Sequence, residues 1–449
     1  MQTQPQLGLR AQRVRDLTYY VLLILSFFSI INYMLRELFG DLPLIGALIP
    51  AWKEGLIFLL YLLFFWKSKV EGRVDWKASR LHWLILFTFV ATILSAISNW
   101  VINPSVLKIT PYDHWVQAHA SIGIVLDGVR TLLEASLYFL VLNALIDDED
   151  TIKDMVHGMI VAAALVAAFG IYQKLAGWET PPSWTYSEVE KGIKIRVFSS
   201  IGNPNALGGF MVLITPIAIA LTLWAKNWGG RIIYGSASLL MLVCLVLTYS
   251  RGAWIGFLAG MLVYTIITRN KWLAIVGIAG LVAAPFVAEG VVSRLTLAFT
   301  PEYWQKASEG GRVEFWARAL TIFKEYPVFG TGIGTVGDSV ATRNGVPGAT
   351  WIDNQYFKLL AEIGIVGTLA YVAMVFTPVI KGVKAVFGSK QRDTFLFALN
   401  AGIVAALFGM LVENFTAAIF EDLNVITHFW TLIALLYVSI RLQAGKAKA

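Results

Sequence analysis

The sequence predicts an all-α membrane protein with about twelve transmembrane helices and one long loop outside the membrane. Charged residues make up only 14% of its 449 residues and hydrophobic residues 57%, whereas a soluble domain of this length would carry roughly 25% charged residues. Apolar runs of the roughly 20 residues needed to cross a bilayer recur along nearly the whole chain. The 16 Trp and 16 Tyr fit the same interpretation, because these residues collect at membrane interfaces.

The predicted spans follow these apolar runs, and neither an internal repeat nor a soluble terminal domain interrupts them. They cover residues 17–35, 50–66, 81–99, 120–144, 155–175, 205–224, 231–249, 252–268, 271–288, 356–380, 394–413 and 424–441. The first run is too long for a signal peptide and lacks a small-residue cleavage site, so we expect it to remain as a span. We expect residues 1–449 to form one membrane domain, with the loop at 289–355 as its longest interruption.

The placement of Lys and Arg predicts the orientation, because cytoplasmic loops of membrane proteins are rich in these residues. With the N-terminus inside, every inner loop is net basic except the acidic stretch at 147–150. We therefore expect both termini in the cytoplasm and the loop at 289–355 on the extracytoplasmic side. This placement explains most of the net charge of +7 and argues against nucleic-acid binding.

The same orientation leaves a surplus of basic residues on the outer side, where positive charge works against the topology. They are Lys191, Lys194, Arg196, Arg251, Arg294, Lys306, Arg312, Arg318, Lys324 and Arg343. A solvated loop explains several of them. Arg251 is harder to explain in this way, because it lies in TYSRGAWIGF, between two spans and with almost no loop around it. We expect some of these arginines to have another use.

The long loop is predicted to contain an amphipathic helix that lies on the outer membrane surface or over a cavity. Its apolar residues recur at helical spacing, at Val313, Trp316, Leu320 and Phe323. Two glycines precede this segment and Pro327 follows it. Arg312 would stand at the helix start, where the helix dipole disfavours a cation, so it either faces an anion or is simply exposed. Arg318 is expected on the polar side of the helix.

Two outer segments contribute further polar candidates. The segment RVFSSIGNPNALGG contains Arg196, Asn203 and Asn205, and its Asn-Pro and glycine residues predict a turn before the sixth span. Asp353 opens the tenth span, with Asn354 beside it. A carboxylate in this position either caps the helix or acts as a general base, and the sequence leaves both possibilities open.

Charged residues also interrupt the predicted spans. Asp127, Arg130 and Glu134 are spaced to share one face of the fourth span. Such residues are costly in a membrane and normally pair or face a cavity, so we expect either an internal ion network or a path for substrate or protons. Lys53 and Glu54 begin the second span, where we expect them to extend to the outer interface.

Metal and nucleotide chemistry are not expected. The single Cys244 and the scattered histidines form no pattern typical of a metal site, so we expect neither a metal nor another cofactor. Gly330, Gly332 and Gly334 resemble a phosphate loop only superficially, because no strand precedes them. We expect these glycines to form tight turns.

Four segments together resemble the superfamily of O-antigen ligases and O-antigen polymerases, which are bacterial envelope glycosyltransferases. The segments are GNPNALGGFMVL, TYSRGAWIGFLAG, GRVEFWARALTIFKEYPVFGTGIGT and DNQYFKLLAEIGIVGTLAYV. Their order, the predicted spans and the long outer loop before the tenth span match that superfamily. The resemblance covers about residues 190–380 by motif and the remainder by topology.

The resemblance implies that a glycan carried on undecaprenyl pyrophosphate is transferred to an acceptor glycan or glycolipid at the outer face of the bacterial cytoplasmic membrane. It implies that Arg251 and Arg312, with Arg196 nearby, bind the pyrophosphate through bidentate hydrogen bonds and that Asp353 takes the proton from the attacking hydroxyl. The further candidates for substrate contact are the polar residues Asn203, Asn205, Arg318 and Asn354. Membrane lipids, a chain-length regulator and a flippase are the other expected partners.

One departure from the family affects the choice of reaction. Ligases of this superfamily that act on lipid A–core carry His where this chain has Asp353. An Asp can still take the proton, but the change favours a polymerase that joins repeat units over a ligase. The alternative function is a transporter for an anionic solute, since some relatives are labelled bicarbonate transporters. Its main support is the charged face of the fourth span, and the lack of repeat halves speaks against it.

Overall fold

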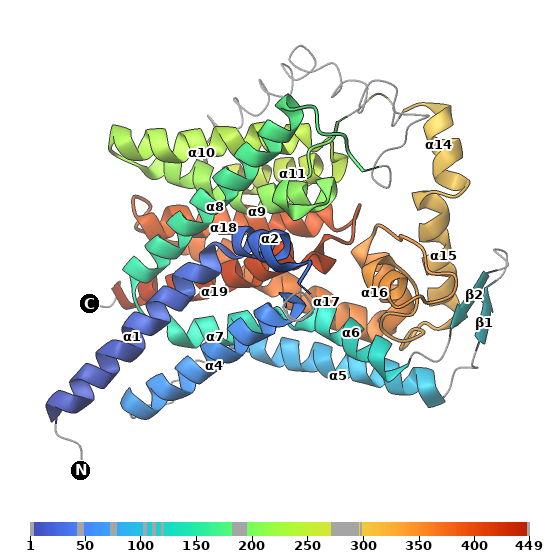
Figure 1. The fold of residues 1–449 in the computed structure, drawn as a ribbon, viewed down its shortest axis with the longest axis horizontal. Helices are drawn as coiled ribbons and strands as arrows, with labels where there is room; N and C mark the ends of the chain where they lie inside the picture. Colours follow the sequence, from blue (N-terminus) through green and yellow to red (C-terminus); the bar gives the residue numbers. More distant parts are fainter. Residues whose placement is uncertain are drawn as a thin grey trace.

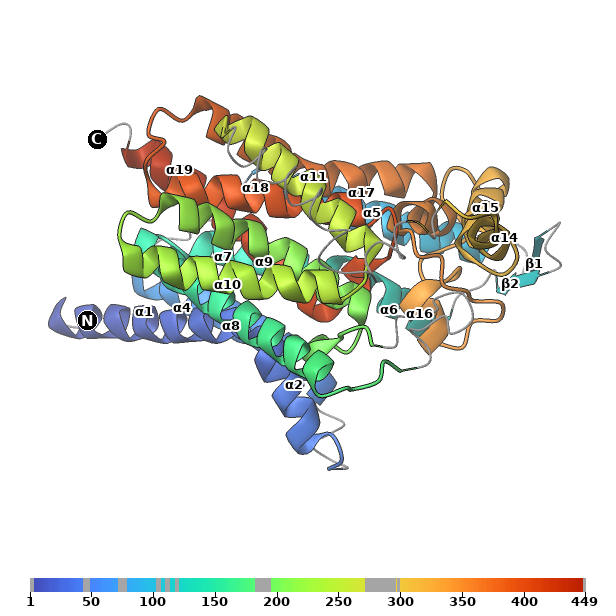
Figure 2. The same cartoon turned by 90° about the horizontal axis from the view of Figure 1, so that it is seen from above.

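The structure, a computed structural model, describes residues 4–42, 49–71, 79–101, 106–109, 114–117, 121–181, 195–270, 296 and 299–446. The predicted ninth span at 271–288 lies outside the described residues, as do Lys191, Lys194 and Arg294. Figure 1 shows a bundle of long helices, and Figure 2 shows that most of them run in nearly the same direction. The N- and C-termini lie at one end of this bundle, and the elements of the long loop lie at the other.

Eight helices in the described ranges are long and apolar enough to cross a membrane, or nine if one bent pair counts as a span. They are α5 (Arg80–Val101), α8 (Glu149–Leu175), α9 (Pro204–Trp224), α10 (Trp228–Leu247), α11 (Arg251–Thr268), α17 (Gln355–Gly388), α18 (Phe395–Glu413) and α19 (Leu423–Lys446). Helices α9, α18 and α19 form the centre and are buried on nearly every side. The prediction of a multi-pass helical membrane protein is confirmed, with eight or nine candidate spans described instead of twelve.

The bent pair corrects the prediction of a straight first span at 17–35. It consists of α1 (Gln4–Ser26) and α2 (Phe28–Phe39), which meet at an angle of 74°, so that α2 turns out of the bundle (Figure 2). Asn32 of α2 is buried, and its side-chain oxygen accepts a hydrogen bond of 3.1 Å from Trp52 Nε1. Met34 on the same helix is half exposed. The bend therefore turns the polar side of α2 inward.

The predicted span at 120–144 is likewise broken. It consists of α6 (Ile122–Leu133) and α7 (Ser136–Leu145), joined by a tight turn at Glu134. Helix α4 (Trp52–Glu71) packs beside α1 and α7. Three short 3₁₀ helices, η1 (Ile49–Ala51), η3 (Ser199–Ile201) and η4 (Ile419–Glu421), lead into the helices that follow them.

Glycines set the closest helix crossing, between α11 and α18. A Cβ on Gly256 would lie 2.6 Å from the carbonyl oxygen of Gly409, and one on Gly260 would lie 2.4 Å from that of Ala405. Small residues at four-residue spacing let membrane helices approach until their backbones touch. This crossing places Gly252, next to Arg251, against Thr416 just beyond the end of α18.

The long loop folds into α14 (Pro301–Ser308), α15 (Arg312–Glu325) and α16 (Asp338–Arg343). The predicted helix of the loop is present as α15, which packs on the first part of α17; its place on the outer membrane surface or over a cavity stays a prediction. Beside these helices lies an antiparallel hairpin of β1 (Val106–Ile109) and β2 (His114–Gln117), paired from Val106 with Gln117 to Ile109 with His114. The all-α prediction did not include this hairpin.

Candidate active site

The glycines of the long loop support a break in α17. Gly364 interrupts this helix with φ +62°, which leaves backbone groups without helical partners on both sides of the break. The loop supplies those partners: Gly332 N donates to the Glu362 carbonyl at 2.8 Å, and Ile365 N donates to the Pro327 carbonyl at 2.8 Å. Gly330, Gly332 and Gly334 all have positive φ. The prediction of tight turns in place of a phosphate loop is confirmed.

The amides of this loop face a carboxylate of the protein itself. Val336 N donates a hydrogen bond of 3.2 Å to Oε1 of Glu362, whose side chain is completely buried. Successive backbone N–H groups in such turns form an anion-binding concavity. Here Glu362 occupies it, so the loop is fixed to the start of α17, where Asp353 and Asn354 stand.

Asp353 and Arg312, predicted from different segments, form an ion pair. Arg312 Nε lies 3.0 Å from Asp353 Oδ2, and the two side chains are 34% and 26% exposed. Both are thus within reach of a ligand from outside. The cap of α17 is Asn354, whose side-chain oxygen accepts from the backbone N–H groups of Tyr356 and Phe357 at 3.0 Å each. Asn354, and not Asp353, therefore caps this helix.

Asp338 holds the backbone of Asp353 in place. Asp353 has φ +52° and Asp338 has φ +57°, a left-handed conformation that is uncommon for residues other than glycine and costs free energy. Asp338 is completely buried, and its Oδ1 accepts the Asp353 N–H at 3.2 Å. The pKa of Asp338 is raised to about 7, chiefly by burial, with the charge of Lys358 opposing the rise and the Asp353 carboxylate adding to it. Sequence reasoning missed Asp338, because no local pattern marks it.

Arg251 lies at the start of α11 and contacts α14. Its Nη2 donates to Tyr303 Oη at 3.0 Å, and its guanidinium lies 4.7 Å from the centroid of the Tyr303 ring. Its Nη1 is buried and has no hydrogen-bond partner among the described residues. Helix α14 ends just before Arg312. The two predicted pyrophosphate ligands therefore border the same short helix, and Tyr303 orients one of them.

Arg196, Asn203 and Asn205 support the turn that presents Arg251. Arg196 is buried, and it donates from Nε to the Thr248 carbonyl at 3.0 Å and from Nη2 to Asn205 Oδ1 at 2.9 Å. Asn203 caps α9 by accepting from the N–H groups of the next residues. These contacts give all three a structural role, and their contact with substrate stays a prediction.

Arg318 does not lie on the polar side of its helix, as was predicted. Its side chain is among the largest that are fully buried, and Nε and Nη2 have no hydrogen-bond partner in the part of the chain that the structure describes. Burial lowers the pKa of its guanidinium. The prediction was wrong because α15 is covered on this side by other elements, which helical spacing alone does not reveal.

The charged face of the fourth span takes part in a partly exposed ion network. Glu134 pairs with Lys53 at 2.5 Å and with Arg130 Nε at 3.2 Å, and Arg130 Nη2 also lies 2.6 Å from Glu54. Lys53 is buried, so the expectation that it extends to the interface was wrong. Asp127 accepts two hydrogen bonds from Arg343 of α16, at 2.6 and 2.8 Å. The network thus joins the loop to the bundle.

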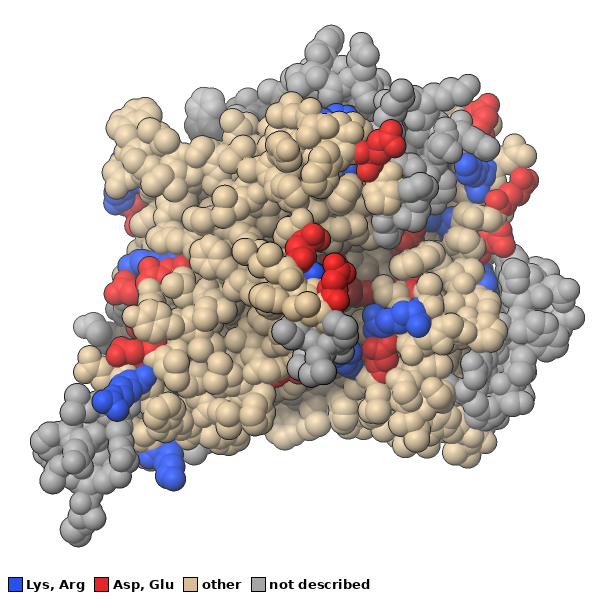
Figure 3. All heavy atoms as spheres, viewed as in Figure 1, with Lys and Arg blue, Asp and Glu red and all other residues tan. Residues whose placement is uncertain are grey.

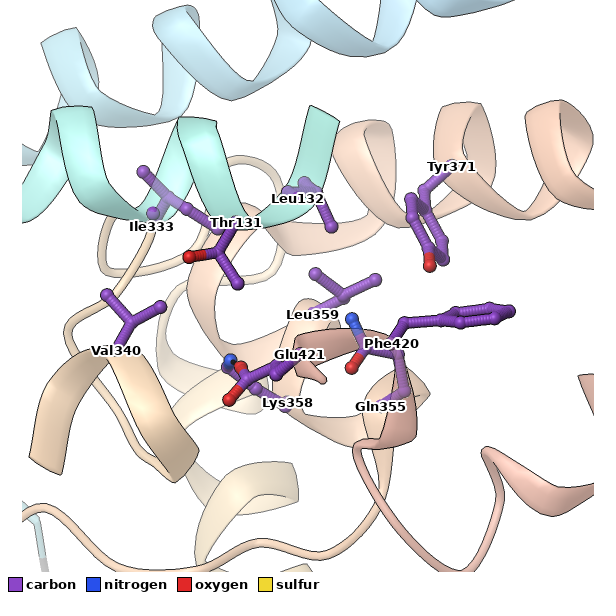
Figure 4. A pocket seen from close by; sticks show the side chains of 11 residues that line it. Thr131, Leu132, Ile333, Val340, Gln355, Lys358, Leu359, Tyr371, Phe420 and Glu421 are labelled. Atoms are coloured by element: carbon purple, nitrogen blue, oxygen red, sulfur yellow. Dashed lines mark ion pairs between the residues drawn. The ribbon is translucent and has the colours of Figure 1, made fainter. Parts of the chain in front are cut away.

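Figure 4 shows a small pocket behind the start of α17. Lys358 forms an ion pair with Glu421 at its floor, beside Gln355. Glu421 Oε2 also accepts the N–H of Ser339 at 2.6 Å, which ties α16 to η4. Sequence reasoning missed Lys358, although a lysine within an apolar run is a signal of a polar site in a membrane protein.

A family model described as O-antigen ligase matches residues 236–372. No curated protein matches the chain. The matched segment runs from α10 to the first half of α17, so it contains Arg251, Arg312, Asp338 and Asp353. This match supports the resemblance of the chain to the superfamily of O-antigen ligases and polymerases.

Proposed function

We propose that the protein is a membrane glycosyltransferase that transfers a glycan from undecaprenyl pyrophosphate to an acceptor sugar hydroxyl. The observation that carries this proposal is the ion pair between Arg312 and Asp353, at the loop end of the bundle, with both side chains partly exposed. A cation and a carboxylate in contact can act on the leaving group and on the nucleophile of one displacement reaction. The cation stabilises the leaving pyrophosphate, and the carboxylate accepts the proton of the nucleophile.

The reaction balances with these groups alone. The acceptor hydroxyl gives its proton to the Asp353 carboxylate as its oxygen forms a bond to the anomeric carbon. The bond between that carbon and the phosphate oxygen breaks, and its electron pair leaves with undecaprenyl pyrophosphate. Attack opposite the leaving group inverts the anomeric configuration. Arg251, whose Nη1 lacks a partner among the described residues, and Arg312 bind the departing charge.

The ion pair also explains how the base is kept inactive without donor. In the unliganded protein Asp353 Oδ2 accepts from Arg312. A bound pyrophosphate carries more negative charge than a carboxylate and draws the guanidinium toward itself. Asp353 then loses its partner at the moment when a proton acceptor is needed. Because the carboxyl group is about one quarter exposed, it can return the proton to water after the transfer.

Asp353 favours a polymerase over a ligase, because ligases of the superfamily that act on lipid A–core have His at this position. In this role the acceptor is a second lipid-linked glycan, and a flippase and a chain-length regulator are the expected partners. We place the reaction on the extracytoplasmic face of a bacterial cytoplasmic membrane, with both termini in the cytoplasm. No metal takes part in the proposed chemistry.

The ion network speaks against the alternative, a transporter for an anionic solute. Its main support is the charged face of Asp127, Arg130 and Glu134. In the described part of the chain, Arg130 is paired with Glu54 and Glu134, and Arg343 is paired with Asp127. These pairs tie α6 to α4 and α16, a structural role that explains the charges of this face without a solute path, so this observation favours the glycosyltransferase.

Reconstitution in vesicles with an undecaprenyl-pyrophosphate-linked oligosaccharide tests the proposal. The wild-type protein should lengthen or transfer the glycan in the presence of EDTA, while Asp353→Ala and Arg312→Ala should not. Asp393→Ala is a matched control, because Asp393 pairs with Lys226 on an exposed surface away from the site. Full activity of both site variants would refute the assigned roles. Bicarbonate uptake into sealed vesicles without glycan turnover would favour the transporter.

A further inference from the structure

A second, larger pocket of about 370 Å³ lies between the outer ends of several helices. Figure 3 shows acidic and basic side chains around a hollow between α2 and α16. Its lining includes Asn32, Arg36, Lys53, Glu134, Asn424 and Thr427. No described lining residue comes from α11, α14 or α15, which carry Arg251 and Arg312.

The charges that line this pocket are balanced. Lys53, Arg130 and Arg343 are each in an ion pair with a carboxylate, and Arg36 at the rim lies near Asp422. The carboxylates of Glu134, Glu421 and Asp422 also line the pocket and repel an anion, so the pocket suits a neutral ligand. It presents donors and acceptors side by side, the arrangement that a ligand with several hydroxyl groups requires.

Two lining residues point to a missing hydrogen-bond partner. Thr427 is about 1% exposed, and its hydroxyl forms no hydrogen bond within the described residues. Glu134 Oε1 is also buried and without a donor there, although Oε2 pairs with Lys53. Buried polar atoms are normally satisfied, and leaving one unpaired is costly. A sugar hydroxyl can donate to the carboxylate and pair with Thr427.

A smaller pocket links this one to the start of α17, the helix that follows Asp353. The larger pocket shares Thr131 and Glu421 with the small pocket of Figure 4, whose floor is formed by Gln355 and Lys358 in the first turns of α17 after Asp353. In a displacement with inversion, the nucleophile and its base lie opposite the leaving group. The pyrophosphate ligand Arg251 lies at α14. The absence of Arg251 and Arg312 from the described lining favours the acceptor, and not the pyrophosphate, as the ligand of this pocket.

The neighbouring helix α2 suits an acceptor that is anchored in lipid. Asn32 and Arg36 of α2 line the pocket, while Met34 and Leu38 of the same helix are 50% and 63% exposed. Because α2 leaves the bundle at 74° to α1, these apolar side chains lie beside the pocket and face outward. A glycan bound in the pocket can thus keep its lipid anchor in the bilayer.

We propose that this pocket binds an uncharged sugar residue of the lipid-anchored acceptor glycan, through Glu134, Thr427 and the asparagines Asn32 and Asn424. The proposal rests on the proposed glycosyltransferase function, to which it adds the acceptor subsite. It expects recognition of hydroxyl groups, with little dependence on salt, since surface charge attraction is what salt screens.

Thr427→Val tests the proposal, because valine keeps the shape and removes the hydroxyl. The variant should raise KM for the acceptor about three- to tenfold, as expected for one lost hydrogen bond, while kcat and KM for the lipid-linked donor stay within twofold. Thr427→Ser should restore the wild-type KM. Thr265→Val in α11, whose hydroxyl bonds only to its own helix, is the matched control for folding in detergent. An unchanged acceptor KM in Thr427→Val would overturn the assignment.

A binding measurement separates the pocket from the reaction. The oligosaccharide released from the donor lipid is titrated calorimetrically into the Asp353→Asn protein, which has no base for turnover. Binding that is weakened by Thr427→Val, and unaffected by 0.5 M NaCl or inorganic pyrophosphate, would support the pocket even if transfer failed. Displacement by pyrophosphate would identify an anion site and refute the proposal. If the wild type transfers the glycan but Asp353→Asn binds the oligosaccharide equally well with and without Thr427→Val, the pocket assignment is refuted and the glycosyltransferase function is not.

Discussion

Among single residues, Asp353 connects three separate parts of the chain. Its side chain pairs with Arg312 of α15, its backbone N–H is held by Asp338 of α16, and it directly precedes the cap of α17. The left-handed backbone carries a cost that the surrounding contacts must offset. Such strain at an ion pair within reach of ligand is what we expect of a residue selected for reaction geometry.

Asp353→Asn should lower kcat for glycan transfer by about 10²- to 10⁴-fold, the usual contribution of a general base. Arg312→Lys should lower it by about 10²- to 10³-fold, since lysine keeps the charge but loses the planar donor fork that stabilises the leaving group. Rates with a lipid-linked oligosaccharide measure both effects, with Asp393→Asn as the control. A wild-type kcat in Asp353→Asn would mean that another group takes the proton.

Asp338 acts through Asp353 and can be tested as a positioning residue. Asp338→Asn keeps an oxygen that accepts the Asp353 N–H and should retain most of the activity. Asp338→Ala removes the acceptor and should lower kcat about tenfold or more, because small displacements of a base are costly. Equal activities of the two variants, at equal expression and thermal stability, would show that the hydrogen bond does not matter.

Asp338 also predicts how stability depends on pH. Its ordinary pKa is 3.8, and burial raises it to about 7 in the folded protein. Between these values the folded state binds the proton and the unfolded state does not, so stability falls as pH rises from about 4 to about 7 and then levels off. Asp338→Asn has no titrating carboxyl group here, so its stability lacks this pH-dependent contribution. Its thermal unfolding temperature should therefore gain on that of the wild type between pH 4 and pH 8; a difference that shrinks as pH rises would contradict the assignment.

Helix breaks explain the site at the scale of elements. Helix α17 is interrupted at Gly364, the predicted fourth span is broken at Glu134, and the first bends after Ser26. Each break exposes backbone groups or turns polar side chains inward. In α17 the glycine-rich loop supplies the missing hydrogen bonds, which fixes the loop and Asp353 relative to each other.

Gly364→Ala should destabilise the protein, because a Cβ there would lie 2.4 Å from the backbone carbonyl of Val328 and the residue has φ +62°. The positive φ alone costs about 1–3 kcal/mol. The midpoint of thermal unfolding in detergent should fall, and glycan transfer should fall with it. Gly388→Ala is the matched control at the end of the same helix, where an added Cβ meets nothing within 4 Å. Similar midpoints for the two variants would contradict this explanation of the break.

At the level of the whole molecule, charge pairs join the loop to the helix bundle. Arg343 of α16 binds Asp127 of α6, and α16 also carries Asp338. Because the Arg343 side chain is 45% exposed, we expect the pair to contribute only about 1 kcal/mol to stability. We expect its larger effect to be on the position of α16 relative to α17.

The double substitution Asp127→Arg with Arg343→Asp should therefore recover activity that each single substitution loses. Each single variant leaves a like-charge contact and shifts α16, and we expect transfer rates to fall about tenfold. The exchange restores the pair with reversed polarity. Transfer rates of the four proteins give the coupling between the two positions. Independent, additive effects would mean that this pair does not position the loop.

Local pattern was enough to predict the helical membrane class, the helix α15 and the turns of the glycine-rich loop, and to select Arg312 and Asp353 as candidates. Each of these depends on composition or on residues close together in the chain, where apolar length, helical spacing and turn chemistry act directly. The burial of Arg318, the bend before α2 and the ion pairs of Lys53 could not be predicted in this way. They depend on which distant element covers a given face, and no periodicity encodes that.

The contact between Arg312 and Asp353 belongs to this second kind. Both residues stood out along the chain, one as a cation at a helix start and the other as a carboxylate at the mouth of a span. Only the folded chain brings them within 3.0 Å, because α15 packs on the first part of α17 and Asp338 turns the backbone of Asp353 toward it. Packing between elements far apart in sequence decides which charges meet, and here it decides where the proposed reaction takes place.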